Sequence, residues 1–423
     1  MQNKHIETIA VQAGWEPKNG EPRVTPIVQS TTFRYTSSKE LADLFDLKVA
    51  GHFYTRLSNP TVEVVEKKMA ALEGGVGAVA YASGQAATTA LVMNLCQAGD
   101  HFVSTATIYG GTFNLFAHTL RKLGIEVSFV DQNAPEDEIA KAIRPNTKFI
   151  FGETLSNPSV KVLDIEKLAR LARAADLPLV IDNTFPTPVL CRPFDHGANI
   201  VVHSLTKYSD GHASSLGGII IDKGDYNFAN GKFPDLSLPD PTYHGLVYTR
   251  DFGALGFIVK ARAHILRDTG AQLAPLNAFL INMNLETLPL RMQRHSDNAL
   301  ALAQHLEKHP KVAWINYPGL DSSPEKPLAE KYLKGCSGVF TFGIKGDVKQ
   351  AAKFMDSLKL AAQVIHVADA RTGVLHPAST SHRQLSDEDK KTSGILPELI
   401  RVTVGLEHID DIIADFDQAL ENV

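Results

Sequence analysis

Apolar positions follow two different periods along most of this chain. From Val62 onwards, short apolar runs alternate with stretches in which apolar residues recur every three or four positions. The runs predict strands, which we place at residues 76–81, 101–104, 125–130, 149–152, 179–181, 200–203 and 217–221. Between them the helical pattern is clearest at residues 62–72, 83–95, 112–123 and 165–175. Strands that alternate with helices indicate a mostly parallel sheet covered on both faces, so we expect an α/β fold.

The pattern differs at the two ends of the chain. The first 62 residues have few periodic apolar faces and several Pro and Gly residues, which predicts an extended N-terminal arm. Beyond about Pro275 the pattern predicts a smaller α+β domain, with helices at 277–288, 294–307, 347–358 and 409–420 and strands at 339–344 and 400–404. We therefore expect an arm (1–62), a large sheet domain (63–280) and a C-terminal domain (281–423).

Composition excludes several classes of function. The formal net charge of −5 gives no basic footprint, and nucleic-acid binding needs clustered Lys and Arg. No apolar run approaches the roughly 20 residues of a membrane span, and the N-terminus lacks the apolar core of a signal peptide, so we expect a cytoplasmic protein. The three cysteines are expected to be reduced packing residues. No metal site is expected, because the spacing of His376 and His382 fits no helical zinc pair.

Candidate chemistry lies where the predicted strands end. The stretch 199–208 begins as an apolar strand and ends with Ser204, Thr206 and Lys207. In open α/β sheets, ligands bind outside the carboxyl ends of the strands. A lysine there can be desolvated enough for its amine to become a nucleophile. Taken alone, an exposed loop lysine is the commoner alternative.

Two further strand ends supply groups of a different kind. At 82–85 a strand passes into a helix that starts at Gly84 and Gln85, where free N–H groups could bind a phosphate. The dinucleotide-binding signature fails, because no full G-x-G-x-x-G follows a strand. Asp182 closes an apolar strand, where it could hold a cationic ring nitrogen or cap the next turn.

Three more motifs extend this set. Asn157 ends another strand, and its side-chain amide could donate to a ring oxygen. Tyr109 precedes a flexible Gly-Gly turn, where its ring could stack on a planar cofactor or merely pack against the protein. Tyr54 and Arg56 are two residues apart on extended backbone, which projects both side chains to one side, where they could hold a phosphate. For Asn157, and for the pair Tyr54 and Arg56, the alternative interpretation is an ordinary turn without a ligand. Together with Lys207 and Asp182, the set is what pyridoxal phosphate needs.

The motifs, in this order, resemble the Cys/Met-metabolism family of fold-type I pyridoxal-phosphate enzymes. The likeness runs from Tyr54-Thr-Arg-Leu-Ser-Asn-Pro-Thr to the closing Gly405-Leu-Glu-His-Ile-Asp-Asp. It implies that Lys207 carries the cofactor as a Schiff base, that Asp182 pairs with the ring nitrogen, and that Tyr109 stacks on the ring and assists proton transfer.

The same resemblance implies how the remaining groups bind. The phosphate would be held by Gly84, Gln85, Ser204 and Thr206, and by Tyr54 and Arg56 of a neighbouring subunit. Arg401 would bind the substrate carboxylate, with Asn157 and Tyr54 also near the substrate and Asn157 at the ring oxygen. The active unit is then expected to be a homo-oligomer, a dimer of dimers with shared sites.

Two stretches are similar to one branch of the family, namely 46–51 and a long insert at 226–253. That branch replaces the γ-substituent of O-acetylhomoserine with sulfide or a thiol, which gives homocysteine or a thioether such as methionine, and acetate. The insert exceeds about 12–15 residues, and structureless loops of that length are often functional. At 366–372 the chain departs from the branch, because His366 and Ala368 replace an expected Asn and Gly. An O-succinyl substrate and a γ-lyase acting on methionine or cystathionine therefore stay open as alternatives.

Overall fold

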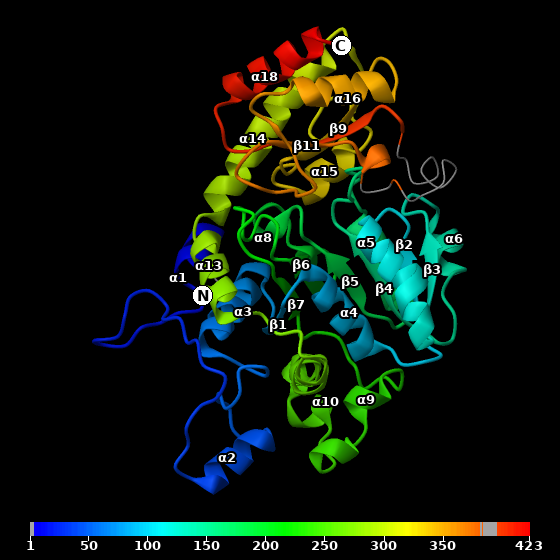
Figure 1. Ribbon diagram of the computed structural model, residues 1–423. Coiled ribbons are helices and arrows are strands. Elements are labelled where there is room, and N and C mark those ends of the chain that lie inside the picture. Colours follow the sequence, from blue (N-terminus) through cyan, green and yellow to red (C-terminus); the bar gives the residue numbers. More distant parts are fainter. Residues whose placement is uncertain (1–3, 381–382, 384–395) are drawn as a thin grey trace.

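The large sheet has seven strands in the order β1-β7-β6-β5-β4-β2-β3 (Figure 1). The computed structural model describes residues 4–380, 383 and 396–423, and His382 lies outside them. The strands are β1 (Gly77–Tyr81), β2 (His101–Thr105), β3 (Glu126–Val130), β4 (Thr147–Glu153), β5 (Leu179–Asp182), β6 (Ile200–Ser204) and β7 (Gly218–Asp222). Only β7 runs against its neighbours in this sheet. The expected α/β fold with a mostly parallel sheet is therefore confirmed.

Helices cover both faces of this sheet, which explains why its strands are apolar on both sides. One buried core joins Ile181 and Val201 to α3 (Pro60–Glu73), α7 (Ile165–Ala174) and α13 (Pro275–Leu285). The other core joins Val180 and Val202 to α4 (Gly84–Leu95) and α11 (Gly256–Lys260). Alternate residues of these strands thus enter opposite cores, and polar side chains gather mainly near the strand ends.

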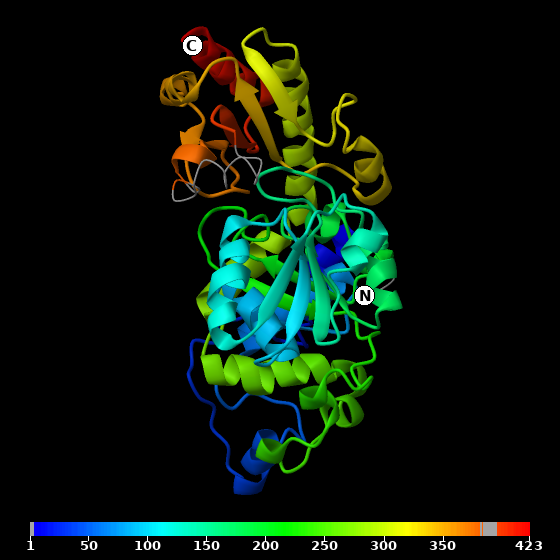
Figure 2. The same ribbon diagram turned by 90° about the vertical axis from the view of Figure 1, so that its right-hand side faces the viewer.

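A second sheet of five strands, in the order β10-β11-β12-β9-β8, is formed by the last part of the chain. Its strands are β8 (Val312–Asn316), β9 (Val339–Ile344), β10 (Ala362–Gln363), β11 (Gly373–Leu375) and β12 (Leu399–Thr403). Among the described residues, the α-helices of this small-sheet region are α14 (Leu288–Glu307), α15 (Lys326–Tyr332), α16 (Val348–Ser357) and α18 (Ile409–Glu421). Figures 1 and 2 both show this region stacked on one end of the large sheet.

Several of these elements differ from the sequence-based prediction. β10 and β11 have two and three residues, too few to show a period, and β8 was also not predicted. α14 begins at Leu288 rather than Arg294, because Pro289 is compatible with the first turn of a helix. The Gly-Gly pair expected to form a turn after Tyr109 instead begins α5 (Gly110–Asn114).

The N-terminal segment is less extended than predicted. It contains α1 (Ile6–Gln12), whose Ile9 enters the large core, and α2 (Ser38–Phe45). The Ser37 hydroxyl caps α2 by accepting from the Glu40 N–H at 3.2 Å. α2 lies at the end of the molecule opposite the small-sheet region (Figures 1 and 2).

The insert at 226–253 contains helices, so the expectation of a loop without secondary structure was wrong, whereas its prediction as a functional segment stays a prediction. It contains α9 (Pro234–Ser237) and α10 (Tyr248–Asp251), and the Phe228 ring stacks on Phe257 with 5.3 Å between ring centroids. The Tyr226 hydroxyl donates to the Asp176 carbonyl at 2.8 Å, just before β5 begins. Aromatic burial therefore fixes the start of the insert at the amino ends of the parallel strands, away from Asp182 at the carboxyl end of β5. No helix in the described ranges is long and apolar enough to cross a membrane.

Candidate active site

Lys207 lies just beyond β6, in a short turn held by its neighbours. The Lys207 N–H donates to the Ser204 carbonyl at 3.2 Å, and the Thr206 hydroxyl accepts from the Gly217 N–H at 3.0 Å. Burial, and to a smaller extent the positive charge of Arg401, lowers the pKa of Lys207 to about 8. No hydrogen bond to the Lys207 amine is found within the described residues. A buried amine with a lowered pKa is suited to act as a nucleophile.

Asp182 ends β5, next to β6 in the sheet. Its Oδ1 accepts from the Thr184 N–H at 2.9 Å and from the Thr184 hydroxyl, so the carboxylate does cap the following turn. Its Oδ2 accepts no hydrogen bond in the part of the chain that the structure describes. Burial raises the pKa of Asp182, whereas the Thr184 hydrogen bonds oppose that rise. A cationic ring beside Oδ2 would favour the ionised form.

A cradle for an anion lies where α4 begins. The Ser83 hydroxyl caps this helix by accepting from the Ala86 N–H at 3.1 Å, whereas the first N–H groups of a helix have no partner within it. A Cβ on Gly84 would lie 2.6 Å from the Cβ of Ser204, so only glycine lets α4 approach β6 this closely. The Ser204 hydroxyl oxygen lies 2.9 Å from the same Cβ position, so it is next to the first residue of α4, where free N–H groups can bind an anion.

The Tyr109 ring is half-exposed and lies close to Gly111, as does the side chain of Gln85. Gly111 makes that position possible, because a Cβ there would lie 2.5 Å from Tyr109 Cε1 and 2.9 Å from Gln85 Nε2. The same glycine lets Gln85 reach the Thr112 hydroxyl at 3.4 Å. The sequence predicted only a turn at Gly111. Its position two residues after Tyr109 was the one feature of the sequence that could have indicated this contact.

Arg401 reaches the site from β12 of the small sheet. Its Nη1 donates to Asn157 Oδ1 at 3.4 Å, and its Nη2 donates to the Ile365 carbonyl at 2.8 Å. Burial lowers the pKa of Arg401 to about 10, which leaves the guanidinium charged at neutral pH. A charged guanidinium at the junction of the two sheets is suited to bind a carboxylate.

The segment 366–372, where the sequence differs from the family branch, lies close to Lys207 and Arg401. His366 Nε2 is buried without a hydrogen-bond partner in the described ranges. Burial lowers the pKa of His366, and the nearby charge of Lys207 lowers it further. Ala368 has φ of 69°, a conformation that costs a non-glycine residue about 1 kcal/mol or more. His366 thus places a neutral imidazole near the amine of Lys207, and Ala368 strains the backbone two residues further on.

Tyr54 and Arg56 are not brought together with the other predicted residues. The Arg56 guanidinium donates to the Arg267 carbonyl and lies 5.2 Å from the centre of the Tyr54 ring. In the described part of the chain, neither side chain hydrogen-bonds Lys207 or the start of α4.

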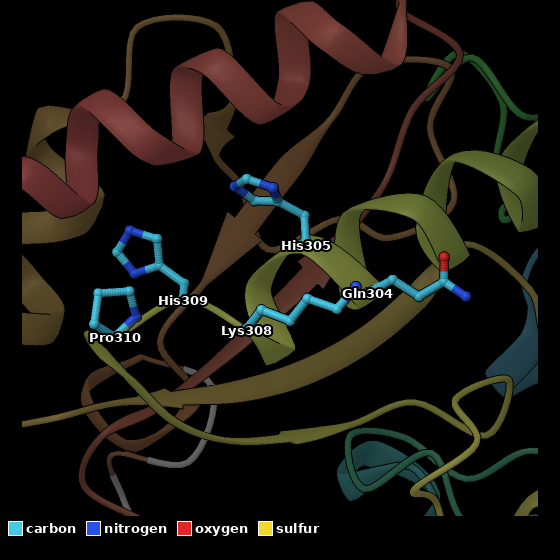
Figure 3. Close-up of a pocket in the computed structure, with 5 residues that line it drawn as sticks. All are labelled: Gln304, His305, Lys308, His309 and Pro310. Atoms are coloured by element: carbon cyan, nitrogen blue, oxygen red, sulfur yellow. The ribbon is translucent and has the colours of Figure 1, made fainter.

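A hollow of about 280 Å³ lies elsewhere, at the C-terminal end of α14 (Figure 3). It is lined by Gln304, His305, Lys308, His309 and Pro310, none of which is a predicted site residue. His305 is already paired with Asp417, at 2.6 Å between Nε2 and Oδ1. The hollow has no part in the chemistry of the strand ends.

The sequence pattern of the Cys/Met metabolism PLP-dependent enzymes matches residues 7–421. The chain belongs to this family. Its cofactor is pyridoxal phosphate, as the sequence predicted, and the residues at the strand ends fit that group. Within the described residues, the N–H groups of Gly84 and Gln85 have no hydrogen-bond partner and can bind a phosphate, Asp182 Oδ2 accepts no hydrogen bond and can face a ring nitrogen, and the Lys207 amine has no partner.

Individual members of the family are similar over the whole chain. O-acetyl-L-homoserine sulfhydrylase from Leptospira meyeri is 46% identical, covering 100% of this chain and 98% of that protein. Homocysteine synthase from Schizosaccharomyces pombe is also 46% identical, covering 100% and 99%. A solved structure from Campylobacter jejuni that contains N'-pyridoxyl-lysine-5'-monophosphate is 38% identical, with a TM-score of 0.95, and covers 99% of this chain and 100% of that one.

Asp182 provides a direct test of how this PLP enzyme holds the cofactor ring. We expect Asp182→Ala and Asp182→Asn to lower kcat by about 10²–10³-fold, the usual effect of removing one preorganised electrostatic partner. Asn can still accept the Thr184 hydrogen bonds with its amide oxygen, so a loss in that variant reports the missing charge. Steady-state kinetics at saturating cofactor measures the effect. Near-normal kcat in Asp182→Asn would show that the carboxylate is only a turn cap.

Proposed function

We propose that this protein is a transferase that replaces the acetoxy group of O-acetyl-L-homoserine with sulfide, giving L-homocysteine and acetate. The observation that carries the proposal is the end-to-end likeness to the Leptospira meyeri sulfhydrylase and the Schizosaccharomyces pombe homocysteine synthase. The buried guanidinium of Arg401, on the small sheet, and the buried amine of Lys207, after β6, lie close enough for the charge of one to lower the pKa of the other, and such a pair suits an amino-acid substrate. A thiol could replace sulfide, and the product would then be a thioether such as methionine.

Each side chain has a distinct part in this reaction. Bound pyridoxal phosphate supplies electron withdrawal from the α-carbon of the substrate. Arg401 binds the substrate carboxylate, and Asp182 Oδ2 keeps a proton on the ring nitrogen. Lys207 Nζ, in its neutral form, removes the α-proton and returns a proton later. Tyr109 would stack on the bound ring, and its hydroxyl would assist proton transfer near the leaving group.

The bond changes balance without an oxidant or a reductant. The bond between Cγ and the ester oxygen breaks, and its electron pair leaves with acetate. Sulfide then supplies the pair that forms the new bond between Cγ and sulfur. The side chains at the strand edge only move protons and hold charge, so they are regenerated after each turnover.

The proposed working form is a homo-oligomer in the cytoplasm, in which Tyr54 and Arg56 bind the cofactor phosphate of a neighbouring subunit. Support comes from their placement, since the Arg56 guanidinium contacts the Arg267 carbonyl rather than its own strand edge. Tyr54 is 40% exposed, so a second copy could contact it.

A product assay tests the proposed reaction. The purified holoenzyme is given O-acetylhomoserine, O-succinylhomoserine or methionine, each with and without sulfide. We expect homocysteine only from an O-acyl substrate with sulfide present, and the acetyl ester to be preferred. Abundant 2-oxobutyrate from methionine without sulfide would contradict the proposal and favour a γ-lyase. The imidazole of His366 near Lys207 is the observation that keeps O-succinylhomoserine in the assay.

A further inference from the structure

Glu153 is a buried carboxylate at the end of β4 to which the proposed reaction assigns no part. Its side chain is only 5% exposed. Oε1 accepts from the Tyr109 N–H at 2.7 Å, and Oε2 accepts from the Asn157 N–H at 3.3 Å. One carboxylate therefore holds the backbone of two residues that are predicted to contact the cofactor ring.

The position of Glu153 in the sheet adds a second link. It pairs in register with Asp182 on the neighbouring parallel strand. Burial raises the pKa of Glu153 well above its usual value, and the charge of Asp182 raises it further, whereas the two N–H groups oppose that rise. A buried acid that meets a second acid is unfavourable unless other contacts compensate. The two backbone hydrogen bonds are the compensating contacts.

The effect of Glu153 extends beyond its direct partners. Asn157 accepts from Arg401 Nη1 at 3.4 Å, so the backbone position of Asn157 influences where the guanidinium lies. Tyr109 carries the ring that covers Gly111, with no room for a Cβ between them. A shift at Glu153 would thus move the stacking ring on one side and the carboxylate-binding arginine on the other.

We propose that Glu153 is a positioning residue that sets where the Tyr109 ring and the Asn157 amide lie against the cofactor and, through Asn157, where Arg401 meets the substrate. Both of its oxygens accept backbone N–H groups, and Glu153 acts through these two contacts. The part that concerns the substrate rests on the proposed function. The part that concerns the cofactor does not.

The strand end itself is held by contacts that do not involve the Glu153 side chain. The Thr154 N–H donates to the Asp182 carbonyl at 3.0 Å, and the Thr154 hydroxyl donates to Asn183 Oδ1 at 2.9 Å. β4 also keeps its pairing with β2 and β5. A change confined to the Glu153 carboxylate should therefore leave the fold in place and alter the site.

The test compares Glu153→Gln with Asp415→Asn in the full-length protein. A glutamine has one carbonyl oxygen, so one of the two N–H groups would face an NH₂ group. Asp415 is a matched control, because this buried carboxylate also accepts backbone N–H groups, from Lys359 at 2.8 Å, Leu360 at 3.0 Å and Ala361 at 2.9 Å. It lies on α18, in the small-sheet region and away from the strand edge.

We expect Glu153→Gln to weaken pyridoxal phosphate binding to the apoenzyme by about tenfold, the effect of losing one buried hydrogen bond. The visible circular dichroism of the bound cofactor should fall, and KM for O-acetylhomoserine should rise by more than kcat falls. Asp415→Asn should lower the melting temperature but leave the cofactor affinity, the dichroism and KM unchanged.

Wild-type cofactor affinity, dichroism and KM in Glu153→Gln would overturn the inference. So would a variant that, like Asp415→Asn, changes only the melting temperature. If Glu153→Gln does not fold, Glu153→Asp asks the same question, because a side chain shorter by one methylene draws both oxygens away from their N–H donors. Cofactor affinity and dichroism need no acyl substrate, so their loss would support the inference even if the product assay contradicted the proposed function.

Discussion

Lys207→Ala is expected to lower turnover by about 10⁴-fold or more, the largest effect of any single change in this protein. The side chain is proposed both to hold the cofactor covalently and to carry the α-proton, and proton transfer alone contributes about 10²–10⁴-fold. With a pKa of about 8, roughly a tenth of the amine is neutral at pH 7, a far larger fraction than for an ordinary lysine. Steady-state kinetics gives the loss in kcat.

A covalent label checks the same residue independently of activity. Borohydride treatment of the holoenzyme should fix the cofactor to the peptide that contains Lys207, and should fix none to the Lys207→Ala chain. Lys68 on α3 is a matched control, because burial also lowers the pKa of its amine to about 8. The Lys68→Ala variant should still carry the cofactor on Lys207 after borohydride treatment, and it should keep most of its kcat. Near-normal kcat in Lys207→Ala, or a label on Lys68, would refute the assignment.

Mixing two inactive variants is expected to restore activity from near zero, the second large effect. Arg56→Ala should bind the cofactor weakly, because an arginine makes charge-assisted hydrogen bonds to phosphate. If Arg56 serves the site of a neighbouring subunit, a hybrid dimer with Lys207→Ala contains one site with both defects and one intact site. Random exchange between equal amounts of the two chains then gives about a quarter of the wild-type activity.

The experiment needs proof that hybrids form. Two distinguishable affinity tags, one on each variant, allow the mixed species to be isolated after subunit exchange and assayed alone. A mixture of Lys207→Ala with Asp182→Ala is the control, because both residues are placed at the same strand edge and their hybrids should contain no intact site. Isolated Arg56 hybrids that stay inactive would mean that Arg56 serves its own chain or none.

The sequence by itself determined the order of elements and the place of the chemistry. Alternating periods predicted the strands of the large sheet, because strands buried on both faces must be apolar along their whole length. The polar residues that break these runs, such as Lys207, Asp182 and Asn157, could then lie only at strand ends. These strand ends could be predicted from short stretches of sequence, because an apolar run and the polar residue that ends it are neighbours in the chain.

The tertiary structure alone decided which of these groups meet. Glu153 holds Tyr109 across 44 residues, and Arg401 reaches Asn157 across 244. Such contacts depend on strand order and on the packing of the small sheet, and no local pattern encodes them. The same holds for Gly111, where the need for glycine arises from a neighbouring ring rather than from a turn.

The N-terminal segment and the insert at 226–253 were misjudged for a related reason. The Pro and Gly residues of the first segment and the length of the insert predicted irregular chain, but Ile9 of α1 and Phe228 of the insert are each buried against distant elements. Burial against that surface outweighs weak local preference, because most of the stability of a short helix comes from packing. A sequence window shows the preference of a segment, and only the folded molecule shows the surface on which the segment packs.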